Sequence, residues 1–277
     1  MTYVSVIIPT FNKSPLVCDI VRNLNQQTFK DFEIIVVDDG SSDNTVRKLK
    51  LLRREERHLK IKVLETGLTD QFGMCNAINL GLQNAKGPIA LLINDDIYLH
   101  PTCIEQHTIV HRQTNLRHAL IGPRFRSPPY RIGGTVLQEG KVWQKHIRTH
   151  TTGQICDNHY VYCKREMVSS NLSMSTDLLC KIGGYNEFFT QYTGAIDREL
   201  YYRLEKNNTK VLYVWQAQAY AIRYNNSIYH NTKWMQDNEF RDGLNVSQWK
   251  RQQMRYSEKM ELQAQQHPPH PIVRRGI

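Results

Sequence analysis

The chain has 277 residues, of which 40% are hydrophobic, so it can build one large domain or two small ones with a full core. Its formal net charge of +10 predicts an anionic partner, such as a nucleotide, a phosphorylated or lipid-linked acceptor, or an anionic membrane. The basic residues are spread along the sequence, and no zinc-finger, helix-turn-helix or RNA-recognition pattern occurs, so we expect no nucleic-acid partner.

The N-terminus leads directly into the apolar segment Val4–Ile8, without the basic and apolar regions of a signal peptide. No apolar run approaches the roughly 20 residues that a membrane-spanning helix needs. The six cysteines have no regular spacing, which favours reduced thiols over a disulfide framework. These features predict a cytoplasmic protein.

The first hundred residues alternate between expected strands and expected helices. Apolar runs predict strands at Val4–Ile8, Glu33–Val37, Ile61–Leu64 and Ile89–Ile93. Helices are expected at 14–27, around the apolar positions Val46, Leu49, Leu51 and Leu52, and at Cys75–Ala85. This alternation predicts an α/β fold, with a mostly parallel sheet covered by helices on both faces.

Polar residues follow three of these strands directly, as Pro9–Asn12, Asp38-Asp39 and Asn94-Asp95-Asp96. In parallel sheets, ligands bind beyond the carboxyl ends of the strands, so these clusters are expected to meet at one rim. Unpaired carboxylates are costly to bury, by about 2–7 kcal/mol or more, whereas Mg²⁺ and Mn²⁺ prefer carboxylate oxygen and often share a substrate phosphate. The alternative is that these aspartates only cap loops and helices.

The pattern weakens after residue 100. Gly-Pro, Pro-Pro and Gly-Gly pairs across Pro101–Trp143 predict loops and an acceptor-side insertion, and order is expected again at Val168–Leu179 and in a helix at Asp197–Glu205. Residues 241–277 carry seven Lys or Arg and three Asp or Glu. A tail helix is expected there, either docked on the body or lying on a membrane, before a disordered run at His267–Pro271. The apolar stripe of that helix comprises Val246, Trp249, Tyr256, Met260 and Ala264.

Four stretches, occurring in the same order along the chain, resemble the family 2 glycosyltransferases, an inverting group with the GT-A fold. They are Val4–Asn12, Glu33–Asp43, Asn76–Asp96, and Gly183–Glu187 followed by Ala195–Leu200. The resemblance covers roughly residues 3–225. It implies a GT-A fold, a nucleoside-diphosphate sugar as donor (UDP-sugar as the usual one) and a glycan or lipid-linked acceptor.

Carried over by position, the resemblance also implies roles for single residues. Asp39 would accept a hydrogen bond from the base, Phe11 would stack on it, and Asp95 would fix the ribose or the metal. Asp96 would bind Mn²⁺ or Mg²⁺ on the diphosphate, and Asp197 would be the general base. The implied nucleotide-binding residues are Pro9, Thr10, Phe11, Asn12, Asp39 and Asp95.

The expected organisation is a nucleotide-sugar half at 1–100, an acceptor and catalytic-base half at 101–230 of the same domain, and a basic helical tail at 231–277 that offers peripheral contact with the inner face of a membrane. Asn94 stands where the family has the first Asp of its metal motif, and Ile196 stands where it usually has Glu. The competing hypothesis is therefore a nucleotide-sugar-binding protein without turnover. Three alternatives stay open: Asp38 and Asp39 as caps, Phe11 as core, and Asp197 as a favourable charge at a helix N-terminus.

Overall fold

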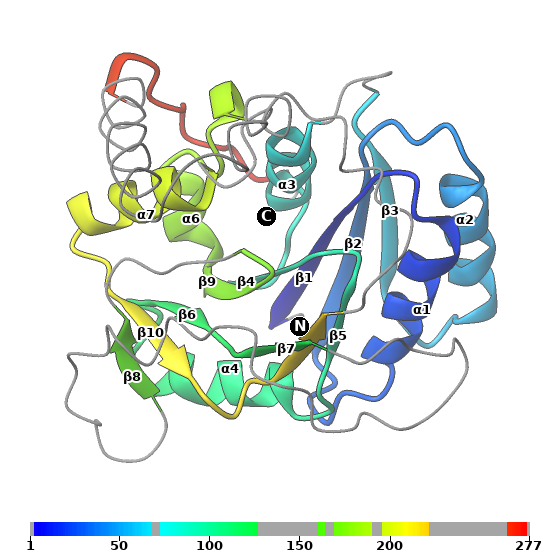
Figure 1. Cartoon of the computed structure of the whole chain (residues 1–277), viewed down its shortest axis with the longest axis horizontal. Coiled ribbons are helices and arrows are strands. Elements are labelled where there is room, and N and C mark those ends of the chain that lie inside the picture. Colours follow the sequence, from blue (N-terminus) through cyan, green and yellow to red (C-terminus); the bar gives the residue numbers. More distant parts are fainter. Residues whose placement is uncertain are drawn as a thin grey trace, which may run out of the picture.

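An eight-stranded sheet forms the centre of the molecule, in the order β3-β2-β1-β4-β9-β6-β10-β8 (Figure 1). The computed structural model describes residues 3–67, 73–126, 160–163, 169–189, 196–221 and 265–275. The strands are β1 (Val4–Thr10), β2 (Phe32–Asp38), β3 (Ile61–Glu65), β4 (Ile89–Ile93), β6 (Ala119–Ile121), β8 (Tyr160–Cys163), β9 (Asn171–Ser175) and β10 (Val211–Val214). Only β8 and β9 run against the other six, which confirms the predicted mostly parallel sheet with a mixed acceptor-side region.

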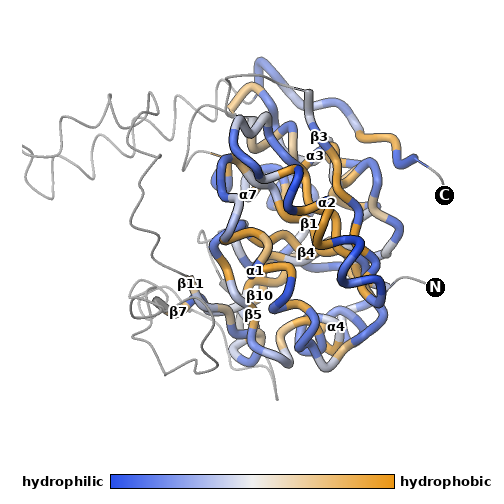
Figure 2. The backbone as a smooth tube through the Cα atoms, turned by 90° about the vertical axis from the view of Figure 1, so that its right-hand side faces the viewer, coloured by the Kyte–Doolittle hydropathy of each residue, from blue (hydrophilic) through white to orange (hydrophobic). Residues whose placement is uncertain are grey.

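Helices cover both faces of the sheet, as the strand–helix alternation predicts. They are α1 (Ser14–Leu24), α2 (Thr45–Glu55), α3 (Met74–Gln83), α4 (Cys103–Gln113), α6 (Thr176–Lys181) and α7 (Ile196–Lys206). Side chains alternate along β1, so that Ile7 packs with α3, α6 and α7, whereas Val6 and Ile8 pack with α1, α2 and α4. The central strand β4 is correspondingly apolar over its whole length (Figure 2), and β1 is apolar apart from Ser5 and its last residues.

The segment 103–126 contains regular structure where the sequence predicts loops. It forms α4, β6 and β7 (Arg124–Arg126), and β7 belongs to a small sheet with β5 (Ile97–Leu99) and β11 (Ala219–Ala221). The apolar pattern of α4 is weak because this helix buries His107 and His111, which hydrogen-bond to β9 instead of packing as hydrocarbons. Residues 127–143 of the expected insertion lie outside the described part of the chain.

The C-terminal segment is docked, and the expected disorder of its His-Pro-rich run is wrong. Residues 267–275, which we call the strap, run toward α3 in red in Figure 1. The Ile272 amide donates to the Cys180 carbonyl at 2.9 Å, and the Arg274 side chain donates to the Ala85 carbonyl. The tail helix predicted before the strap, with its apolar stripe, falls outside the described residues. Within the described residues, no helix is long and apolar enough to cross a bilayer.

Candidate functional site

The ends of β1, β2 and β4 meet at one rim of the sheet. In the parallel register Thr10 pairs with Asp38, and the Asp39 amide donates to the Thr10 carbonyl at 2.9 Å. From the other side, the Thr10 hydroxyl donates to Asp95 Oδ2 at 2.9 Å. The three polar clusters that the sequence places after strands therefore come together. Pro9 and Thr10 are the last residues of β1, however, so the turn begins at Phe11 rather than at Pro9.

The turn after β1 is held by Asn12. This residue has a φ of +52°, a conformation that asparagine tolerates better than most residues, and its side-chain oxygen accepts from the amides of Ser42 and Asp43 at 2.8 and 3.2 Å. Asn12 thus joins the turn after β1 to the loop after β2. The preceding Phe11 is half-buried and lies in neither of the apolar clusters that form the core.

The two aspartates at the end of β2 have different partners. Asp38 accepts from the amides of Gly40 and Ser41, so it closes the turn that follows the strand. Asp39 instead accepts from the Gly73 amide, with the Thr66 hydroxyl 3.5 Å away. Burial raises the pKa of Asp39 to about 6. The protein thus keeps at this position a carboxyl group that is a strong hydrogen-bond acceptor once ionised.

Asp95 forms a buried ion pair that the sequence analysis misses. Lys13 Nζ lies 3.7 Å from Asp95 Oδ1, and the side chains are 6% and 7% exposed. Burial raises the pKa of Asp95 to about 6 against the opposing charge of Lys13. Lys13 directly follows the first polar cluster, and this position could have indicated a role at the site. A single lysine there is equally typical of an exposed surface charge, so the sequence does not distinguish the two.

Asp96 presents an oxygen suited to a cation. Its Oδ1 atom is buried and has no hydrogen-bond partner within the described residues. Burial raises the pKa of Asp96, and the nearby charges of Lys13 and Arg124 oppose that rise. Magnesium-like ions are commonly held by one or two carboxylates together with substrate phosphates, so a single carboxylate with a bare buried oxygen fits such an ion.

Asp197 lies in the first turn of α7, which spans one residue more at each end than predicted. Its Oδ1 atom accepts from the amide of Ser169 at 3.2 Å and from the hydroxyl of the same residue. Burial raises the pKa of Asp197 to about 7, whereas the hydrogen bond from the Ser169 amide and the charge of Arg124 act to lower it. A carboxyl group with a pKa near 7 is well matched to accepting a proton at neutral pH.

Arg124 links the two halves of the site. It stands at the start of β7, and both Asp197 and Asp96 act on its pKa, which burial lowers and their charges raise. Sequence reasoning missed this residue because it follows Gly122-Pro123 in a stretch that reads as loop. Arg124 can therefore supply positive charge both to the carboxylate that fits a cation and to the carboxylate that fits a general base.

Comparison with known proteins gives a consistent family. The family model for Glycosyl transferase family 2 matches residues 5–165. A chondroitin synthase of Pasteurella multocida is 27% identical over 228 residues, which cover 72% of this chain and 22% of that protein. A chondroitin synthase of Escherichia coli is 27% identical over 246 residues, covering 78% and 34%. The chain thus spans about a third or less of the length of these curated relatives.

Solved structures share the fold at low identity. S. aureus TarS 1–349, in complex with UDP-GlcNAc, aligns with a TM-score of 0.62 at 18% identity and covers 83% of this chain and 61% of its own. GalNAc-T7 with UDP, GalNAc and Mn²⁺ aligns with a TM-score of 0.62 at 13% identity, covering 80% and 44%. These likenesses confirm the GT-A fold. Since the family model matches more than half of the sequence, this chain belongs to Glycosyl transferase family 2.

Proposed function

We propose that this chain is a divalent-metal-dependent, inverting glycosyltransferase that moves a sugar from a UDP-sugar to a hydroxyl group of a glycan or lipid-linked acceptor. One observation carries the proposal. Asp96 and Asp197 are about a hundred residues apart in sequence, yet both are electrostatic neighbours of the same half-buried arginine, Arg124. A donor diphosphate near Asp96 and an acceptor hydroxyl near Asp197 would then both lie in the neighbourhood of this arginine.

The donor would bind at the rim formed by β1, β2 and β4. Asp39 would accept a hydrogen bond from the base, and Phe11, which is not part of the core, would stack on it. Pro9, Thr10 and Asn12 would shape the turn beneath the nucleoside, and Asp95, fixed by Thr10 and Lys13, would set the ribose. The complexes of TarS and GalNAc-T7 with uridine nucleotides make UDP the first nucleotide to test.

Asp96 would hold a Mn²⁺ or Mg²⁺ ion through its bare Oδ1 atom, with Arg124 adding a second positive charge nearby. Such an ion supplies charge neutralisation to the diphosphate as it leaves. The GalNAc-T7 complex with Mn²⁺ supports this use of a cation in the fold.

Asp197 would take the proton of the acceptor hydroxyl while that oxygen attacks the anomeric carbon. The bond from the sugar to the diphosphate breaks as the new glycosidic bond forms, UDP departs, and the proton stays on Asp197 until solvent removes it. A positioned base of this kind contributes about 10²–10⁴ in rate. In-line attack at one carbon inverts its configuration.

The test is release of free UDP. The purified chain is incubated with a panel of UDP-sugars and acceptor glycans, with Mn²⁺ and with a chelator. The proposal expects UDP release that depends on both the metal and the acceptor. Binding of the nucleotide with no release in any pool would instead favour the nucleotide-sugar-binding protein without turnover.

A further inference from the structure

We infer that the C-terminal strap is a positioning element for the base, acting through Ile272 on the loop that carries Tyr185. This inference rests on the proposed role of Asp197. The strap and Asp197 are far apart in sequence, and no motif connects them. The connection is a series of contacts that passes through the Gly183-Gly184 pair.

The glycine pair is shaped to receive the strap. Both residues have positive φ, +89° for Gly183 and +61° for Gly184, a region that other residues rarely adopt. A side chain at Gly183 would press on Pro269 and the His270 carbonyl, and one at Gly184 would overlap both Ile272 of the strap and Asn79 of α3. The backbone of this turn therefore lies directly against the strap, with no side chain between them.

The same turn is tied to the helix that carries Asp197. Arg203 of α7 donates to the carbonyls of Ile182 and Gly184 at 2.6 and 2.8 Å. Its guanidinium is fixed in turn by two hydrogen bonds to Glu199, one helical turn earlier. The turn is thus held by α7 through polar contacts and by the strap through packing.

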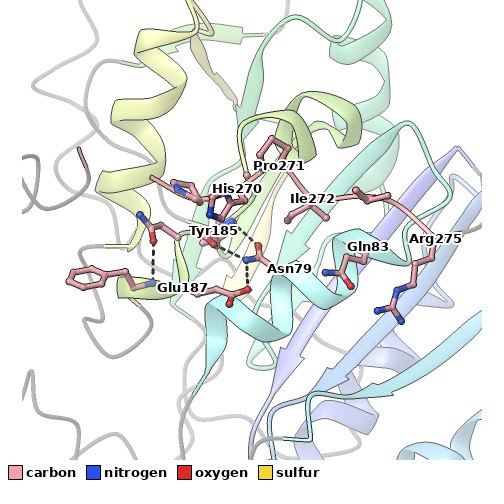
Figure 3. Close-up of a pocket in the computed structure, with 13 residues that line it drawn as sticks. Asn79, Gln83, Tyr185, Glu187, His270, Pro271, Ile272 and Arg275 are labelled. Carbon is pink, nitrogen blue, oxygen red and sulfur yellow. Dashed lines mark hydrogen bonds between the residues drawn. The ribbon is translucent and has the colours of Figure 1, made fainter. Parts of the chain in front are cut away.

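Tyr185 is an electrostatic neighbour of the general base, Asp197. Its side chain is fully buried, and burial together with the charge of Asp197 raises the pKa of its phenol well above the ordinary value. Asn79 of α3 fixes its backbone, accepting from the Tyr185 amide at 2.8 Å and donating to the Tyr185 carbonyl at 2.7 Å (Figure 3). A shift of the glycine turn would therefore move a residue whose phenol feels the charge of Asp197, and would pull through Arg203 on the helix that carries Asp197.

The strap does not cover the loop evenly. A cavity of about 540 Å³ lies between the strap and α3, lined among others by Asn79, Gln83 and His270 (Figure 3). Ile272 packs against the apolar core cluster beside this cavity, whereas its neighbour Val273 is 81% exposed. The apolar contact of the strap with the core is therefore concentrated at Ile272, and the adjacent residue provides a matched control.

The experiment compares Ile272→Asp, Ile272→Ala, Ile272→Val and Val273→Asp in the full chain. A misplacement of about 1 Å at a reacting group can cost about 10²-fold in rate, so Ile272→Asp is expected to lower kcat by about 10- to 100-fold. The KM for the donor should stay within about twofold, because the donor rim is formed by the ends of β1, β2 and β4 and not by the strap. The conservative variant Ile272→Val should keep the kcat of the wild type, and so should the control Val273→Asp.

Hydrogen exchange at the Ser169 amide, which donates to Asp197, gives a readout that needs no turnover. Faster exchange there in Ile272→Asp, with unchanged exchange at the Asp39 amide, supports the inference. If Ile272→Asp fails to bind UDP, Ile272→Ala decides by the same two readouts. Unchanged kcat and exchange in a folded variant would overturn the inference, as would equal losses in Val273→Asp. A wild type that releases no UDP would overturn the proposed function only, because the exchange result still decides the role of the strap.

Discussion

At the donor rim, the side chains extend from the ends of neighbouring parallel strands, whereas Asp197 is held by segments that are far apart in the chain. The register of β1 with β2 and β4 sets Thr10, Asp39 and Asp95 side by side within the first hundred residues. Asp197 instead depends on Ser169 and Arg124, and through Tyr185 on the strap. Changes that loosen packing should therefore impair the base before they impair donor binding.

Replacing the general base, Asp197, gives the largest expected effect. Asp197→Asn keeps the size of the side chain but removes the group that can accept a proton, so transfer should fall by about 10²–10⁴-fold. The affinity for UDP, measured by calorimetry, should stay within about twofold because the donor rim is unchanged.

The exposed carboxylate Asp31, paired loosely with Lys60 on the surface, gives the control. Asp31→Asn should retain full transfer activity. If Asp197→Asn also retained full activity, Asp197 would be only a favourable charge at a helix N-terminus, and it would not be the general base.

At the donor rim the matching change is Asp39→Asn. In this variant one carboxylate oxygen becomes an amide nitrogen, which donates instead of accepting, so the side chain can no longer accept from both the Gly73 amide and the nucleobase. Hydrogen bonds to charged groups contribute about 1.5–3 kcal/mol. The affinity for UDP should fall by about 10- to 100-fold, with kcat at saturating donor close to that of the wild type. A loss of kcat at unchanged affinity would show that the two regions are not separable in this way.

The pH dependence tests the charge environment of the base. Asp197 must be ionised to accept a proton, and burial raises its pKa to about 7, so kcat should fall about tenfold per pH unit below that value. Arg124 opposes this rise, so Arg124→Gln should move the acidic limb to higher pH. Rates at saturating donor between about pH 5 and 9 measure the acidic limb of the wild type and that of the variant. A limb that stays in place, or moves to lower pH, would contradict the placement of Arg124 beside Asp197.

The donor half was predictable from the sequence because its signals are local. Apolar runs, turn residues and polar strand ends occur in order, and Ile89–Ile93 is a strand with the predicted bounds. The helix α4 was missed because it buries histidines in hydrogen bonds, and a search for apolar periodicity does not detect such a helix.

The base half was predictable only as a motif. The sequence placed Asp197 near the start of a helix, but it gave no sign of Arg124 or of the strap, because their contacts join residues from distant segments. The His-Pro-rich run has the composition of a disordered end. It is ordered here because Ile272, which follows the run, reaches the core and the Ile272 amide finds a backbone acceptor.

The smallest expected effect separates stacking from packing at Phe11. Phe11→Leu keeps an apolar side chain but removes the aromatic face, and aromatic stacking is worth about 0.5–1.5 kcal/mol beyond buried area. The affinity for UDP should therefore fall by about 2- to 12-fold. The melting temperature should stay unchanged, because Phe11 belongs to neither core cluster. Phe32→Leu is the matched control, since Phe32 is 5% exposed within the core and should lower the melting temperature without changing UDP affinity. If Phe11→Leu behaved like Phe32→Leu in both measurements, Phe11 would be a core residue, and the donor rim would have no aromatic surface on which the nucleobase could stack.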